Sequence, residues 1–239
     1  MAKHGNYHKT KTPFKYANRR DIPYSIRLTN KKILEIGDER EDAARVALYI
    51  AINQLHKVEG FGYERITRFS VVVGDSVKAY YRSATPDVEQ HNMLKGLQQR
   101  GVDLLGLKIA ASGDLVREAI DGKDGYRREL DAKSAARIKE ERADAAYNAI
   151  GIMLIELADQ HGFGEVRLNR FAKAVSEATN AYYAADDIDT ERKKLEEDLI
   201  KIGFMPDGDK VIAIVDEDKN PIKKGSATWQ RASELLSQS

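Results

Sequence analysis

Pairs of arginines recur in this sequence at one spacing. Arg65 and Arg68 are three residues apart, and Arg167 and Arg170 have the same separation. Residues three apart lie on one side of a helix, where two guanidinium groups together suit a phosphate or an acidic side chain. The alternative role is structural, because these arginines fall in the first turn of a helix and can cap the carbonyl groups that end the preceding one. The sequence favours the structural role and leaves the binding role open.

The first 28 residues are strongly basic and are interleaved with aromatic side chains. The single acid among them is Asp21. Basic side chains neutralise phosphates, and aromatic rings stack on bases, so we expect an extended arm that contacts nucleic acid. The alternatives are a solvated tail and a strap that its aromatic side chains hold against the core. The arm residues that we expect to bind are Lys9, Lys11, Lys15, Arg19 and Arg20.

Patterns typical of catalysis or metal binding are missing from the sequence. Because there is no cysteine, disulfides, thiolate metal sites and cysteine nucleophiles are excluded. His4 and His8 lie in the basic arm, where such a pair is a weak metal signal. The Gly60 and Gly62 region has no following Gly-Lys-Ser/Thr, so it does not match a phosphate loop. We therefore expect a protein that is not an enzyme and needs no cofactor or metal ion.

The overall composition is that of a globular chain. Hydrophobic residues make up 42% and charged residues 32%, which is too rich in core-forming residues for a disordered protein. The net charge of +1 indicates no partner by itself. No apolar run reaches the length of about 18 residues that a membrane span requires. The absence of cysteine fits a reducing compartment, so we expect a cytoplasmic protein with no membrane partner.

The arginine pairs belong to a long internal repeat. Residues 39–101 align with residues 141–203 without a gap, with about 22 identities in roughly 63 positions where chance predicts about four. Gly60-Phe61-Gly62 falls on Gly162-Phe163-Gly164. Residues kept in both copies are those expected to serve the shared fold. Residues that differ are better candidates for a function that distinguishes the halves.

Each copy predicts three helices. In copy one they cover about 38–58, 63–81 and 87–100, and the second and third recur at 165–183 and 189–202. The first helix of copy two is apolar nearly all round, so it should lie at the centre of the core. The glycines that follow each first helix are expected to end it in the left-handed conformation. A phenylalanine would then pack beneath each turn.

The third helices differ between the copies. Copy one carries Lys95 and Arg100 on a polar to basic surface, whereas the same helix in copy two has mixed charge. We expect a specific binding surface to lie on copy one for this reason.

The segments outside the repeats predict smaller elements. A first helix beginning near Thr29 or Asn30 is expected to break or bend at Gly37. Residues 102–140 form a helical connector that leads without a break into copy two. Near the C-terminus, residues 211–215 predict a strand that pairs with residues 222–224, followed by a helix from about Ser226. That helix is expected to bury Trp229, Leu235 and Leu236.

The repeated motif resembles one found in small helical proteins of phages and prophages of Gram-positive bacteria. Their pattern Phe-Gly-Phe-Gly-x-x-Arg-Leu is similar to both copies from its first glycine onward, with Ile66 at the leucine position of the first copy. Glu59 and His161 stand in place of the first phenylalanine. The resemblance covers about a third of the chain. It implies a phage or mobile-element origin and carries no activity with it.

Together these patterns predict a mainly α protein. We expect an internal duplication of a three-helix unit about a pseudo-two-fold axis, with a small C-terminal β-hairpin. The expected segments are an arm at 1–28, repeats at 29–101 and 141–203, a connector at 102–140, and a hairpin with a terminal helix at 204–239. The expected function is non-enzymatic binding of nucleic acid or a nucleoprotein complex by the arm and the first repeat. The alternative is a protein-only inhibitor or adaptor that blocks a host enzyme such as a defence nuclease.

Overall fold

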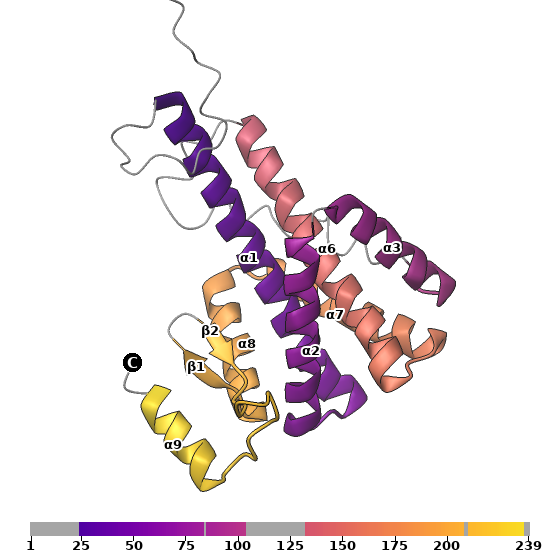
Figure 1. Ribbon diagram of the computed structural model, residues 1–239, viewed down its shortest axis with the longest axis vertical. Helices are drawn as coiled ribbons and strands as arrows, with labels where there is room; N and C mark the ends of the chain where they lie inside the picture. Colours follow the sequence, from indigo (N-terminus) through magenta and orange to yellow (C-terminus); the bar gives the residue numbers. More distant parts are fainter. Residues whose placement is uncertain (1–23, 84, 104–131, 208–209, 237–239) are drawn as a thin grey trace, which may run out of the picture.

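The computed structural model describes residues 24–83, 85–103, 132–207 and 210–236. These residues form a mainly helical protein with one two-stranded sheet (Figure 1). The helices are α1 (Tyr24–Glu59), α2 (Tyr63–Arg82), α3 (Pro86–Gln99), α6 (Ala132–His161), α7 (Glu165–Tyr183), α8 (Ile188–Ile202) and α9 (Ala227–Leu236). None of these helices is both long enough and apolar enough to cross a membrane.

The two longest helices, α1 and α6, lie side by side at the centre (Figure 1). Small residues cluster between them and allow the helices to approach closely, namely Ala43, Ala44, Ala145 and Ala149. Both helices start at the same end of the pair, where Arg40 bridges to Glu141 at 3.2 Å and Arg142 bridges to Glu39. The helices therefore run in the same direction, joined by two reciprocal ion pairs.

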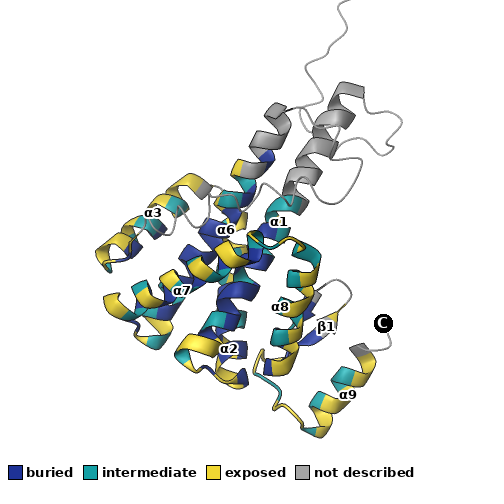
Figure 2. Cartoon of the chain, turned by 180° about the vertical axis from the view of Figure 1, so that it is seen from behind, coloured by how far each residue is buried: buried dark blue, intermediate teal, exposed yellow. Residues whose placement is uncertain are grey.

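The shorter helices pack across the central pair rather than on the helix that precedes them. α7 and α8 lie on α1, whereas α2 and α3 lie on α6. Figure 2 shows the buried residues concentrated on α1 and α6 and on the faces turned toward them. One buried apolar cluster runs through both halves, from Val46 to Val211. The two repeated segments therefore share a single core.

The glycine turns have the same backbone in both copies. Gly60 and Gly162 take φ values of 66° and 63°, the left-handed region that terminates a helix and that glycine adopts without strain. The Phe61 amide then donates to the Leu55 carbonyl at 3.2 Å, and Phe163 does the same to Leu157. Both phenylalanine rings are buried beneath their turns, as the sequence predicts.

The first helix is longer than expected. α1 runs without interruption from Tyr24 to Glu59, so it does not break at Gly37. A single glycine inside a helix costs only about 1 kcal/mol relative to alanine, which a helix of 36 residues tolerates. Residues 24–28, predicted as the end of an extended arm, are therefore helical, and the rest of the predicted arm, residues 1–23, lies outside the described part of the chain.

The C-terminal strands are formed by different segments from those expected. β1 (Met205–Asp207) pairs antiparallel with β2 (Lys210–Ile212), and the predicted pairing of 211–215 with 222–224 is reduced to one bridge between Val215 and Pro221. The Tyr49 hydroxyl explains part of the difference, because it binds both backbone groups of Val211. A side chain of α1 thus takes the place of a strand partner.

The terminal helix is less buried than expected. Trp229 is only half-buried, and Leu235 is 65% exposed. The connector can be compared only at its end, where α6 begins at Ala132 and continues unbroken into the second repeat as the sequence predicts. The rest of the connector, including the helix expected at 104–119, lies outside the described residues.

We expect Gly60→Ala to lower the free energy of unfolding by about 1–2 kcal/mol, because an L-residue is strained at positive φ. A Cβ added at Gly60 meets nothing within 4 Å, so the effect isolates the backbone. Urea denaturation measures it. Gly74→Ala is the matched control, since Gly74 lies inside α2 with equally open space around an added Cβ, and it should raise the free energy of unfolding by about 0.5–1 kcal/mol. Equal losses in the two variants would contradict this account of the turn.

Candidate binding surface

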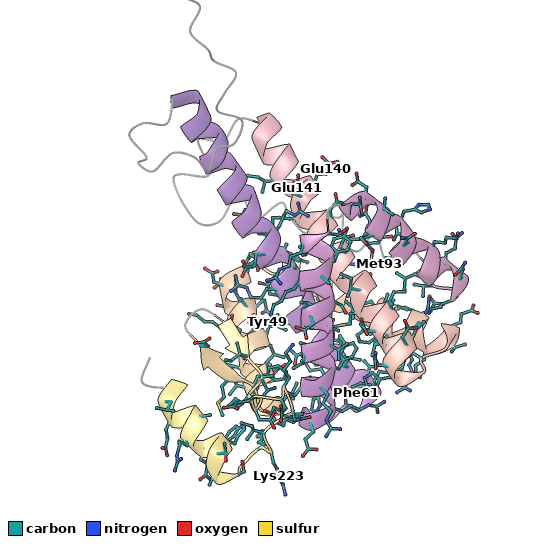
Figure 3. The ribbon with its side chains drawn as sticks, in the orientation of Figure 1. Tyr49, Phe61, Met93, Glu140, Glu141 and Lys223 are labelled. Carbon is teal, nitrogen blue, oxygen red and sulfur yellow. The ribbon has the colours of Figure 1, made fainter. Side chains whose placement is uncertain are left out.

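The two glycine turns meet at one end of the helix pair. The rings of Phe61 and Phe163 lie 6.0 Å apart, edge to face, and His161 packs against Phe61 at 5.1 Å and Phe69 at 5.5 Å. Figure 3 shows Phe61 at the end of the molecule opposite Glu141. Residues from both repeats thus build a single aromatic cluster, and four arginines surround it.

One arginine from each repeat stacks on the phenylalanine of its own turn. The Arg65 guanidinium lies 3.7 Å from the centre of the Phe61 ring, and Arg167 lies 3.8 Å from that of Phe163. Stacking of this kind fixes the plane of the guanidinium and leaves its N–H edge free to bind. Neither group donates to a backbone carbonyl of a described residue, so the predicted capping of the preceding helix is not the role they play.

The arginines of the second repeat bind a buried carboxylate of the first. Arg167 Nε donates to Glu59 at 2.6 Å, and Arg170 donates to its other oxygen through Nη2 at 2.7 Å and Nε at 3.1 Å. The Glu59 side chain is only 1% exposed. Burial raises the pKa of this carboxyl, but hydrogen bonds and charge from both arginines outweigh burial and hold the pKa below its ordinary value. This arrangement is a complete receptor for one carboxylate.

The equivalent place in the other half has no carboxylate. His161 aligns with Glu59, and its Nδ1 lies 3.4 Å from Arg65 Nη2. Burial lowers the pKa of His161, and the neighbouring Arg65 and Arg167 lower it further, so the ring is neutral near pH 7. Arg68 is exposed and has no ion-pair partner among the described residues. The first-repeat arginine pair therefore carries charge that the protein does not neutralise there.

The remaining predicted binding residues separate into three groups. Arg100 binds Asp159 at 2.6 Å and the Gly96 carbonyl at 3.0 Å, so its charge is already used. Lys95 is exposed on α3, with no ion pair to a described residue. The arm cations Lys9, Lys11, Lys15, Arg19 and Arg20 lie outside the described residues.

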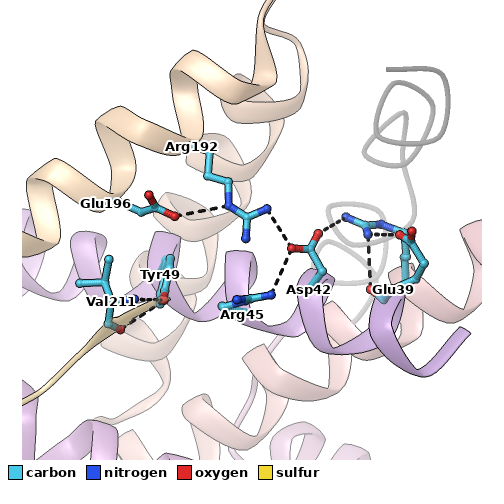
Figure 4. Close-up of polar contacts among 8 residues, drawn as sticks. Glu39, Asp42, Arg45, Tyr49, Arg192, Glu196 and Val211 are labelled. Atoms are coloured by element: carbon cyan, nitrogen blue, oxygen red, sulfur yellow. Dashed lines mark hydrogen bonds and ion pairs between the residues drawn. The ribbon is translucent and has the colours of Figure 1, made fainter. Parts of the chain in front are cut away.

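A second polar cluster lies toward the opposite end of the helix pair (Figure 4). Asp42 pairs with Arg192 at 2.9 Å and Arg142 at 3.1 Å, and Arg142 also binds Glu39. Burial raises the pKa of Asp42, but the two arginines outweigh it and lower the pKa below its ordinary value. Because the Arg142 side chain is only 3% exposed, this cluster holds α1, α6 and α8 together and offers no open surface. Sequence reasoning missed it, since its members come from three distant segments.

A pocket of about 460 Å³ lies between α2, α3 and α6. Its volume is in the range of small-ligand sites, about 300–1,000 Å³. Ser76 donates to Glu156 at 2.6 Å within it. The other lining residues are Ala79, Tyr80, Glu89, Asn92, Met93, Gly96, Arg100, Ile152 and Ile155. Sequence reasoning missed this pocket, because its polar and apolar lining residues come from three separate helices.

Comparisons with known proteins identify no relative. No protein family, curated protein or solved structure matches this chain. Within the described residues, no group of three or more His, Cys, Asp and Glu side chains is placed to hold a metal ion.

We expect Glu59→Gln to lower the free energy of unfolding by about 1.5–3 kcal/mol at pH 7, the range for hydrogen bonds to a charged group. The lowered pKa of Glu59 means that its contribution is present above about pH 4.5, its ordinary value, and is lost as the pH falls through the folded value. The difference between wild type and variant should therefore narrow below that pH. Denaturant titrations between pH 7 and pH 3 measure it.

Glu177→Gln is the control for that experiment. Glu177 is 68% exposed and lies 3.8 Å from Lys173, so an exposed pair is lost instead of a buried one. Its change should stay below about 0.5 kcal/mol. A gap between wild type and Glu59→Gln that stays constant from pH 7 to pH 3 would show that Glu59 is not held as the ionised form.

Proposed function

We propose that this protein is a non-enzymatic binding protein that engages nucleic acid or a nucleoprotein complex through its basic arm and the surface of its first repeat. The observation that carries the proposal is the distribution of unpaired cations. Among the described residues of the second repeat, Lys193 is the one cation that has no ion pair. The first repeat leaves five cations without one, namely Arg65, Arg68, Lys78, Arg82 and Lys95.

The numbers of charged residues in the two repeats also favour the first repeat as the binding surface. Residues 39–101 contain nine lysines and arginines against eight acids, whereas residues 141–203 contain eight against thirteen. A polyanion is therefore repelled by the second repeat and is free to approach the first. Lys95 illustrates the difference, because its counterpart in the second repeat is Glu197.

Four of the five cations lie along one helix. Arg65, Arg68, Lys78 and Arg82 all belong to α2. The last three lie on the side turned away from its buried residues Ile66, Phe69 and Val73, whereas Arg65 lies at the edge of the core against Phe61. From Arg65 to Arg82 the row spans about 25 Å at 1.5 Å per residue, the length of about seven nucleotide steps in a B-form strand. Two acids share the exposed side of α2: Asp75 is neutralised by an ion pair with Lys219, and Glu64 is exposed in the first turn. The cations form two pairs, one near each end of the helix, and two such pairs suit successive contacts with a phosphate backbone.

The repeated sequence supports an origin by duplication. The helices α1, α2 and α3 have the same order and the same glycine turn as α6, α7 and α8. A duplicated scaffold with different charges on its two halves fits a protein in which one half kept a structural role and the other gained a binding role. The resemblance of the motif to phage and prophage proteins supports a role inside a host cell as part of this proposal.

The pocket between α2, α3 and α6 favours a second candidate function. This pocket has an apolar part, lined by Met93, Ile152 and Ile155, beside polar and charged lining residues, and such a mixed lining suits a side chain of a partner protein. This feature supports a protein-only inhibitor or adaptor that blocks a host enzyme. Salt separates the two candidates, because binding driven by phosphates weakens steeply as salt rises, and a packed protein interface does not.

We expect Lys95→Ala to weaken DNA or RNA binding and to reduce the slope of log K against log salt concentration by about one, the loss of one phosphate contact. Fluorescence anisotropy at several salt concentrations measures both. The matched control is Lys193→Ala, which removes an exposed and unpaired lysine from the third helix of the other repeat. The same effect from both variants would show that binding does not distinguish the repeats.

Deletion of residues 1–20 tests the arm. It removes Lys3, Lys9, Lys11, Lys15, Arg19 and Arg20, all outside the described core. We expect the affinity for nucleic acid to fall and the salt slope to drop by several units, while the thermal unfolding temperature stays unchanged. Unchanged binding by the truncated protein would remove the arm from the proposed function.

A further inference from the structure

We infer that Arg65 and Arg68, beside His161, form a site for a single phosphate group of the nucleic-acid backbone. The inference rests on the proposed function and names the anchoring point of that surface. The second copy of the same arrangement supports it, because there the Glu59 carboxylate of the protein itself occupies the equivalent site.

The Glu59 site shows what this arrangement binds. There, two arginines three residues apart on α7 hold one oxyanion with three hydrogen bonds of 2.6–3.1 Å. One of them, Arg167, is oriented by stacking on Phe163. The two oxygens are shared between the arginines, so the pair works as one receptor.

The Arg65 site has the same parts without the oxyanion. Arg65 stacks on Phe61 at nearly the same distance as Arg167 on Phe163, and Arg68 stands three residues on, like Arg170. His161 occupies the place of Glu59 and offers a ring nitrogen at 3.4 Å, a long contact for a hydrogen bond. The oriented guanidinium group of Arg65 and the exposed one of Arg68 are thus left without an anion, and an external oxyanion can supply it.

The surroundings favour a phosphate over an acidic side chain of a protein. A second pair of cations, Lys78 and Arg82, begins about 15 Å farther along α2 than Arg68, and a backbone supplies repeated negative charges over that distance. Arg65 is also in the first turn of α2, where the helix dipole favours a bound anion. An isolated carboxylate would bind Arg65 and Arg68 and would leave Lys78 and Arg82 without an anion.

The decisive variant is His161→Glu, which rebuilds the Glu59 arrangement in the empty half. The new carboxylate should bind Arg65 and Arg68 from within and exclude the external phosphate. We expect affinity for a short DNA or RNA strand to fall about tenfold at low salt and the salt slope to fall by about one. Thermal stability should be equal to or above that of the wild type, which separates this effect from misfolding.

His161→Gln is the matched control, because it removes the ring without adding charge, and it should bind within about twofold of the wild type. A His161→Glu variant that binds nucleic acid as the wild type does would overturn the inference. So would a loss of affinity of the same size in His161→Gln, since the ring itself, and not the missing carboxylate, would then account for it.

A second measurement tests the site when nucleic acid is left out. The Arg65 and Arg68 side-chain N–H signals in NMR spectra should shift saturably with inorganic phosphate in the wild type and not in His161→Glu. If wild type shows this shift but binds neither DNA nor RNA, the proposed function fails, and with it the assignment to a nucleic-acid backbone. If a tetraglutamate peptide shifts these signals and phosphate does not, the site is one for an acidic protein partner and the inference is wrong.

Discussion

Close contact between α1 and α6 is the constraint on which the rest of the structure depends. Alanines at the crossing let the two backbones approach, and the reciprocal pairs Arg40–Glu141 and Arg142–Glu39 fix their register at one end. Because each helix then presents an apolar face to the helices of the other repeat, the core closes around the pair. At the other end the same contact brings the two glycine turns together, which is what assembles the arginine and aromatic cluster.

The two copies of the repeat agree at one end of the helix pair and differ at the other. At the first end, the same glutamate and arginine appear in both copies and bind each other reciprocally. At the second end, one position has diverged: Glu59 satisfies two arginines, and His161 leaves the other two unsatisfied. Ion pairs at both ends stabilise the fold, but the surplus charge arises only at the diverged one. A single residue difference thus separates a closed internal ion pair from an exposed cationic site.

Local patterns in the sequence predicted the helices, the left-handed glycines and the buried phenylalanines, because periodicity and turn chemistry act over a few residues. The partner of Glu59 lies more than 100 residues away, and the sequence gives no means to decide whether the arginines of its own repeat or those of the other bind it. The pairing of the C-terminal strands was missed for a similar reason, since the Tyr49 side chain, from a distant helix, forms hydrogen bonds with the backbone of Val211. The continuous α1 was missed because tertiary packing outweighs the cost of Gly37.

The packing of each repeat's second and third helices on the first helix of the other has a consequence for how such a surface can arise. An intertwined homodimer of single repeats would have the same layout, but its axis would place an identical residue on both sides. A glutamate at the turn would then bind the arginine pair on both sides, and a histidine would leave both pairs without an anion. In a single chain the two halves can differ, so one side can keep its internal ligand while the other side loses it. The divergence of two linked halves therefore gives this protein one closed and one open version of the same arginine pair.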